Sequence, residues 1–93
     1  MTDGQVLDAV AAAKRAYKSA ETIANRRFTS AKKHAEQFFG NDDVERAAKH
    51  NALKRAEAEL IENLNRAKIR FIDRLEFIRE RAKQWADLVP MVR

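Results

Sequence analysis

Four arginines recur along one side of the second half of the chain, at spacings of four, four and seven residues. Together with a phenylalanine set among them they form what we call the arginine ridge: Arg66, Arg70, Arg74, Phe77 and Arg81. Arginine forks match the geometry of phosphate oxygens, and an aromatic ring between them could stack on a nucleobase. The same spacing is also typical of a solvated helix face whose arginines pair with carboxylates such as Glu62 and Asp73.

A second basic face is expected in the first half of the chain, opposite its apolar positions. This helix-one basic face consists of Arg15, Lys18, Arg26 and Lys33, with Thr22 and Thr29 between them. Dispersed basic and hydroxyl side chains suit phosphate contacts that position a nucleic acid without reading its sequence. Solubility alone is the alternative explanation. No helix-turn-helix, zinc-finger or leucine-zipper basic-region pattern indicates base-specific recognition.

The two histidines, His34 and His50, are the remaining residues with chemistry to offer. If they face each other near a turn, Glu36 or Glu45 could complete a metal site with them. Two exposed polar residues beside a turn are the commoner arrangement. The sequence has no glycine-rich phosphate loop, no His-Glu-x-x-His motif and no nucleophile elbow. We therefore expect no catalytic residue, no cofactor and no metal, in a protein that is not an enzyme.

Apolar residues in the first part of the chain alternate between spacings of three and four, the pattern of a long amphipathic or coiled-coil helix. Thr2 and Gln5 fit a capping box at its start. We expect helix one over about residues 4–39. Its apolar positions, called the helix-one seam, are Val6, Val10, Ala13, Tyr17, Ala20, Ala24, Phe28, Ala31, Ala35 and Phe38.

The pattern stops at residues 38–43, which read FFGNDD. Gly40 is predicted to adopt the left-handed conformation that ends many helices, and Asn41 or Asp42 to cap the next helix. A turn of residues 40–41 makes the two helices antiparallel neighbours. Residue i of helix one would then lie opposite roughly residue 82 − i of helix two.

Helix two is expected over about residues 42–89 and to end at Pro90, with its continuity near His50 and Asn51 left open. Because helix two is the longer one, its part beyond about residue 79 would have no partner within the hairpin. Apolar side chains left uncovered, Trp85 above all, are typical of an interface. The predicted interface with a second copy or another protein consists of Phe71, Leu75, Ile78, Ala82, Trp85, Ala86 and Val89.

The amino-acid composition narrows the range of possible fold classes. The chain has 93 residues, no cysteine, two glycines, one proline and a formal net charge of +5, which favours long helices in a single domain over residues 1–93. No apolar run approaches the roughly 20 residues of a transmembrane helix, and the start lacks the features of a signal peptide, so a cytoplasmic protein is expected. We predict an all-α antiparallel helical hairpin that dimerises into an elongated four-helix bundle or coiled coil.

Two functions are compatible with such a fold. The first is a non-enzymatic interaction module, an adaptor, assembly or inhibitor protein that acts through protein–protein contacts of its helix faces. The alternative is a small basic nucleic-acid-binding protein that makes sequence-independent phosphate contacts through the arginine ridge and the helix-one basic face. The net charge of +5 permits an anionic partner without requiring one.

The predicted turn also carries a family resemblance. Phe38-Phe39-Gly40 stands where the Trp-x-Gly family of secreted helical hairpins has its motif, and the two-helix outline of the chain resembles that family. Phe38 replaces the tryptophan, and the Tyr-x-x-x-acidic pattern of the family's tail occurs here only at Tyr17 and Glu21, in helix one. The resemblance implies a secreted hairpin effector.

Overall fold

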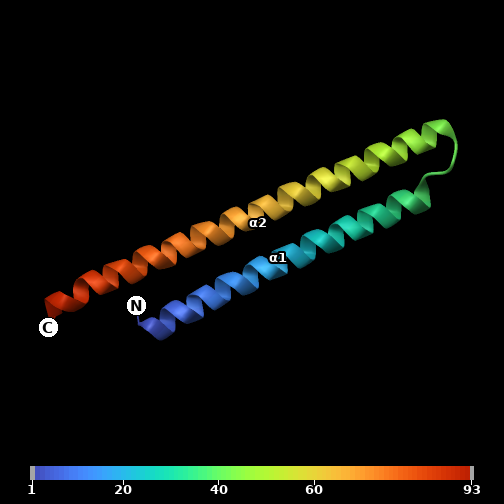
Figure 1. The fold of residues 1–93 in the computed structure, drawn as a ribbon. Helices are drawn as coiled ribbons and strands as arrows, with labels where there is room; N and C mark the ends of the chain where they lie inside the picture. Colours follow the sequence, from blue (N-terminus) through green and yellow to red (C-terminus); the bar gives the residue numbers. More distant parts are fainter. Residues whose placement is uncertain (1, 93) are drawn as a thin grey trace.

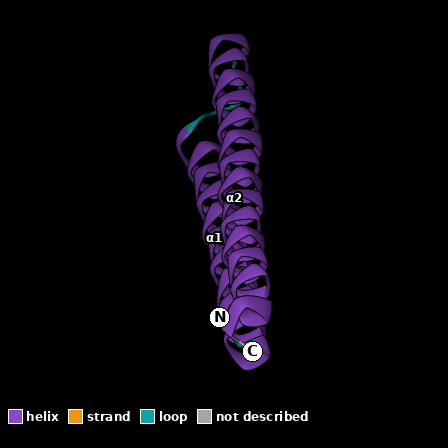
Figure 2. Ribbon diagram, turned by 90° about the vertical axis from the view of Figure 1, so that its left-hand side faces the viewer, coloured by secondary structure: helices purple, strands orange, loops and turns teal. Residues whose placement is uncertain are grey.

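Two long α-helices and one turn make up the structure. A computed structural model describes the backbone of residues 2–92 and the side chains of residues 2–84. Helix α1 spans Asp3–Phe38 and helix α2 spans Asp43–Val92, and the two lie side by side and antiparallel (Figures 1 and 2). The rod measures 77 × 16 × 8 Å with a radius of gyration of 21.3 Å, against roughly 12 Å for a compact domain of this length. The predicted all-α hairpin is confirmed.

Both helices begin at side-chain caps. At α1, the backbone N–H of Gln5 donates to Oγ1 of Thr2 at 3.2 Å, and the backbone N–H of Thr2 donates to Oε1 of Gln5 at 2.9 Å. At α2, the backbone N–H of Glu45 donates to Oδ1 of Asp42 at 2.7 Å. These bonds satisfy N–H groups that have no partner inside a helix. The predicted capping box is therefore present, and Asp42 rather than Asn41 caps α2.

The ends of the helices differ from the prediction. No described glycine has a positive φ, so the left-handed conformation predicted for Gly40 is wrong. Instead Phe39 turns the chain out of α1 in an extended conformation (φ −105°, ψ 133°), while its N–H still donates to the carbonyl of Ala35 at 3.3 Å. Helix α2 is unbroken from Asp43 and continues through Pro90 to Val92, so the predicted end at Pro90 is wrong. The φ of proline is compatible with a helix, although its ring and its missing N–H disrupt the bond to the carbonyl four residues earlier.

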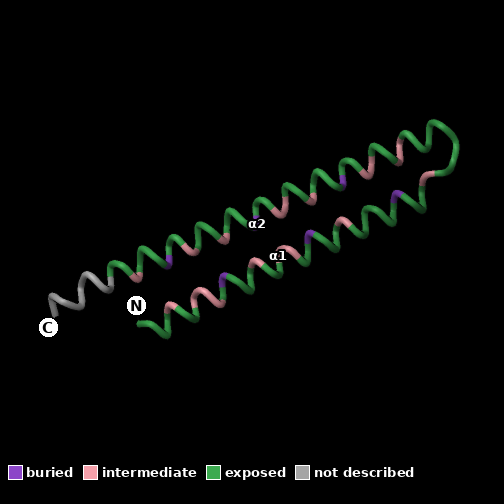
Figure 3. Tube along the Cα trace, in the orientation of Figure 1, coloured by how far each residue is buried: buried purple, intermediate pink, exposed green. Residues whose placement is uncertain are grey.

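Buried residues recur at intervals of eleven along both helices. Within the part of the chain whose side chains are described, they are Ala13, Ala24 and Ala35 on α1, and Ala56, Ala67 and Ile78 on α2. Eleven residues make three turns of about 3.67 residues, so such a stripe follows the axis of a nearly straight helix more closely than a seven-residue repeat does. Buried and half-buried positions lie on the sides of α1 and α2 that face each other (Figure 3). The core is a seam of alanines flanked by larger, half-buried side chains.

The eleven-residue repeat also corrects the end of the helix-one seam. Phe39, eleven residues after the half-buried Phe28, is itself half-buried. Phe38 is 70% exposed, and its ring stacks on that of His34 with 4.2 Å between ring centroids. The spacing of three and four predicted that Phe38 faces inward. This prediction is wrong, because Phe39 faces inward instead.

The offset between the helices differs from the prediction as well. Tyr17 packs against Phe71 with 5.2 Å between ring centroids, and Ala20 and Ala67 line the same depressions. Residue i of α1 therefore lies opposite about residue 88 − i of α2, not 82 − i. The reason is visible at the turn, where the first turns of α2 extend past the end of α1 (Figures 1 and 2).

This offset shortens the part of α2 that has no partner at the other end of the rod. Asp3, the first residue of α1, lies opposite about residue 85 rather than residue 79. Ile78 is accordingly buried and Ala82 half-buried. The predicted overhang therefore begins about six residues later than expected, because α2 projects beyond α1 at both ends of the rod (Figure 1).

Candidate binding groove

A groove runs along one side of the seam between α1 and α2. It consists of two neighbouring depressions with volumes of about 390 and 290 Å³, which share Ala20, Ala67 and Arg70. Arg74 adds to the wall of the first depression, and Arg27 to the wall of the second. Small side chains from both helices make the floor. We call this feature the arginine groove.

The helical repeat decides which residues border the groove. Successive residues of an α-helix are about 100° apart, so residues three before and three after a buried residue fall on opposite sides of it. On α2, Arg70 follows the buried Ala67 by three and borders the groove. Leu64 precedes Ala67 by three and therefore lies on the other side of the seam. The two sides of the hairpin are thus chemically different.

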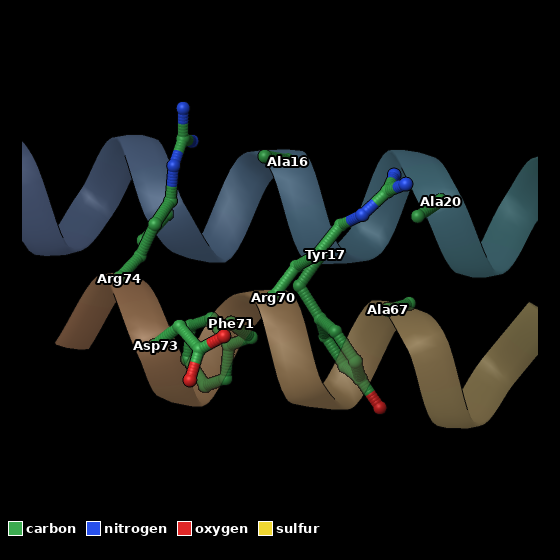
Figure 4. A pocket seen from close by; sticks show the side chains of 9 residues that line it. Ala16, Tyr17, Ala20, Ala67, Arg70, Phe71, Asp73 and Arg74 are labelled. Atoms are coloured by element: carbon green, nitrogen blue, oxygen red, sulfur yellow. The ribbon is translucent and has the colours of Figure 1, made fainter. Parts of the chain in front are cut away.

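Two arginines reach across the groove from α2. In Figure 4 the side chains of Arg70 and Arg74 extend from α2 in the direction of α1, and their stems border the alanine floor near Ala16 and Ala20. Tyr17 extends in the opposite direction, from α1 toward α2. The groove therefore combines an apolar floor with two arginine side chains that extend over it from α2.

The charges of the groove are poorly balanced by the chain itself. Four arginines line it, Arg27, Arg66, Arg70 and Arg74, against one acidic residue, Asp73. Arg66 pairs with Glu62 one turn earlier, and this is the only ion pair among the side chains of residues 2–84. The other three guanidinium groups have no carboxylate partner among those side chains. The groove is therefore electropositive.

The arginine ridge predicted from the sequence does not act as one unit. All five residues are exposed on α2, and Arg66, Arg70 and Arg74 border the groove. Phe77 and Arg81 are not part of its lining. The guanidinium carbon of Arg81 lies 5.0 Å from the centroid of the Phe77 ring, so a cation–π contact covers one face of that ring.

The helix-one basic face lies apart from the groove. Its four members are exposed, and their spacing from Ala13 and Ala24 places them on the side of α1 that faces away from α2. The hydroxyl groups of Thr22 and Thr29 donate to the carbonyls of Lys18 and Asn25, each at 3.0 Å. The structure therefore does not bring this face together with the ridge.

Sequence reasoning missed Arg27, the one basic residue that α1 contributes to the groove. The signal that could have found it is its place three residues after the buried Ala24, on the same side as Ala16 and Ala20. Arg27 could be selected only once the offset between the helices was known, because that offset brings this side of α1 next to Arg66 and Arg70.

The residues predicted as an interface fall into two groups. Phe71, Leu75 and Ala82 are half-buried and Ile78 is buried, and all four belong to the seam within the chain. The other three, Trp85, Ala86 and Val89, lie outside the residues whose side chains the structure describes.

Large apolar side chains remain exposed on the side of α2 that faces away from the arginine groove. Ile61 is 59% exposed and Ile72 is 52% exposed, and each lies one helical turn before a half-buried leucine, Leu64 or Leu75. Residues three apart on a helix share a face. We call this surface the leucine–isoleucine face; it consists of Leu53, Ile61, Leu64, Ile72 and Leu75.

The histidines are not opposite each other. The observed offset of 88 − i puts His50 opposite about residue 38 rather than residue 34. Among the described side chains, no group of three histidine, aspartate or glutamate residues is placed to hold a metal ion. Within the described residues, neither helix contains an apolar stretch that could cross a lipid bilayer.

Comparison with known proteins adds no relative. No family model, curated protein or solved structure matches the chain, and the resemblance to the Trp-x-Gly family stays a prediction.

Proposed function

We propose that this chain is a non-enzymatic interaction module that pairs with a second copy of itself and presents its remaining helix faces to a protein partner. The observation that carries the proposal is the exposure of Ile61 and Ile72, while the buried side chains among residues 2–84 are five alanines and one isoleucine. These two large apolar side chains thus lie beside the seam rather than in it. A second layer of helices would cover them.

The energetics favour such a layer. Two helices joined by alanines bury little apolar area, and chains of this size seldom hold together without further packing. Each isoleucine that is removed from water on pairing contributes about 1.5–3 kcal/mol at full burial. Two hairpins that meet through their leucine–isoleucine faces form a four-helix bundle in which the same surface serves both copies.

Sedimentation equilibrium on the purified chain tests the pairing. We expect a dimer for the wild type and a monomer for Ile72→Lys, because the lysine would place a charge in the contact between copies. Ile23→Lys is the matched control, since Ile23 is 51% exposed but lies on the groove side. A wild type that stays monomeric at tens of micromolar, or two variants with equal effects, would contradict the pairing.

Nucleic-acid binding is the second candidate function, and the three guanidinium groups of the groove without a carboxylate partner favour it. Binding of mixed-sequence DNA or RNA through phosphate contacts would weaken steeply with salt, by about one unit of log–log slope for each phosphate neutralised. Absence of binding to either polymer at low salt would remove this candidate.

A further inference from the structure

We propose that the arginine groove is the docking site for an acidic amphipathic helix of a partner protein. This inference rests on the interaction-module function and specifies the partner's chemistry. The groove lies within a single hairpin, on the side away from the leucine–isoleucine face. It is therefore available whether or not the chain pairs with a second copy.

The shape of the groove suits a helix. The groove runs along both helices, and its lining spans residues 13–27 of α1, roughly 21 Å or four turns at 1.5 Å per residue. Alanine side chains at the floor allow a third helix to approach to the short end of the usual interaxial range of roughly 8–10 Å. An apolar ridge of the incoming helix would cover Ala16, Ala20 and Ala67.

The charges of the groove select an acidic partner. Arg27 stands on the α1 side, and Arg70 and Arg74 extend from the α2 side. A helix seated between them presents glutamate or aspartate side chains to both walls when acidic residues flank its apolar ridge. The stems of Arg70 and Arg74 can move aside and lie along the incoming helix, because arginine packs its apolar stem while its guanidinium stays in water.

The floor of the groove and the position of Phe77 weigh against a nucleic acid in the groove. The floor offers apolar methyl groups and the mutually packed rings of Tyr17 and Phe71, whereas single strands need open aromatic faces on which bases stack. Phe77, the exposed aromatic residue of the ridge, is outside the groove lining and has one face covered by Arg81. An apolar ridge with flanking carboxylates matches this floor better than a phosphate backbone does.

A binding titration with a designed peptide tests the proposal. The probe is a fluorescently labelled helical peptide of about 18 residues, long enough for the four turns of the groove, with leucine and alanine on one face and glutamate on both flanks. A second peptide carries glutamine in place of every glutamate. We expect the acidic peptide to bind and the neutral one to bind at least several-fold more weakly.

Matched triple variants locate the site. Arg27→Gln, Arg70→Gln and Arg74→Gln together remove three charges from the groove, and should weaken binding of the acidic peptide roughly tenfold. Arg15→Gln, Lys18→Gln and Arg26→Gln remove the same charge from the helix-one basic face and should change the Kd less than about twofold. Circular dichroism checks that both variants keep their helices, and Arg70→Gln alone should give a smaller loss.

Three outcomes would overturn the proposal. Equal losses of peptide affinity in the two triple variants would mean that the net charge of the protein attracts the peptide and that the groove does not bind it. Absence of peptide binding at low salt would mean that no acidic helix docks there. Tighter binding of a mixed-sequence 20-nucleotide DNA, lost in the groove variant, would make the site a nucleic-acid site. A chain that sediments as a monomer but still binds the peptide at the groove would defeat the pairing alone.

Discussion

The ring of Tyr17 in α1 packs against the ring of Phe71 in α2, with 5.2 Å between the ring centroids and 34° between the ring planes. A tilted aromatic pair of this kind contributes about 0.5–1.5 kcal/mol beyond the area it buries. A shift of one helical turn would place Phe71 beside alanines and remove the contact. This pair therefore selects one offset among those that the alanine seam would otherwise allow, and that offset decides which side chains border the groove.

The first prediction concerns the offset itself. Because the chain has no cysteine, any disulfide that forms must join the two cysteines introduced by design. Ala20→Cys with Ala67→Cys should form an intramolecular disulfide under mild oxidation, since the two residues line the same two depressions from opposite helices. Ala20→Cys with Ala56→Cys should not, because Ala56 lies eleven residues, roughly 16 Å, further along the same buried stripe. Mass spectrometry of the non-reduced monomer distinguishes the two; closure of the Ala56 pair instead would disprove the offset.

The second prediction concerns the close approach of the helices. Ala24 is 4% exposed, so Ala24→Leu forces extra methyl groups into the seam and should lower the free energy of unfolding by about 1–3 kcal/mol. Ala58→Leu, at an exposed position of α2, should change it by less than about 0.5 kcal/mol. Urea denaturation followed by circular dichroism measures both. Equal effects would show that helix propensity rather than packing decides the result.

The third prediction concerns the start of α2. Asp42→Ala removes the oxygen that accepts the N–H of Glu45 and should cost about 0.5–2 kcal/mol of stability. Asp42→Asn keeps an acceptor oxygen at the same place and should cost much less. Thermal unfolding of the three proteins at one concentration provides the comparison. If asparagine were as damaging as alanine, the charge of Asp42 and not its capping bond would be responsible.

The fourth prediction follows from the proposed pairing. A dimer is favoured by mass action, so the Tm of the wild type should rise as the protein concentration rises. The Tm of Ile72→Lys should be independent of concentration, while Ile23→Lys should behave like the wild type. Calorimetry over a hundredfold range of concentration measures this dependence. A wild-type Tm that does not change over that range would argue against a dimer that folds and assembles together.

Much of the fold could be predicted from local sequence. The apolar spacing along residues 6–38 predicts α1 because it follows the turn of a helix, and the capping groups of Thr2 and Asp42 act on neighbouring N–H groups. Each of these signals involves residues within one or two turns of each other. Of the candidate site, the exposure of Arg66, Arg70 and Arg74 could be predicted in the same way.

The offset and the groove could not be predicted locally. The midpoint of the turn suggested that residue i faces 82 − i. After the extended Phe39, however, α2 begins beyond the end of α1, which moves every opposite pair by about six residues. Arg27 becomes a neighbour of Arg66 and Arg70 only under that offset. No spacing within either helix carries this information.

The sequence by itself determined two helices, their caps, and the apolar side that each must bury, because hydrogen bonds and periodicity within a helix depend on nearby residues. Only the tertiary structure decided which residue of α1 meets which residue of α2. Small alanine side chains permit several alignments of nearly equal area, and the choice is made by the contact between Tyr17 and Phe71 together with the path of the turn.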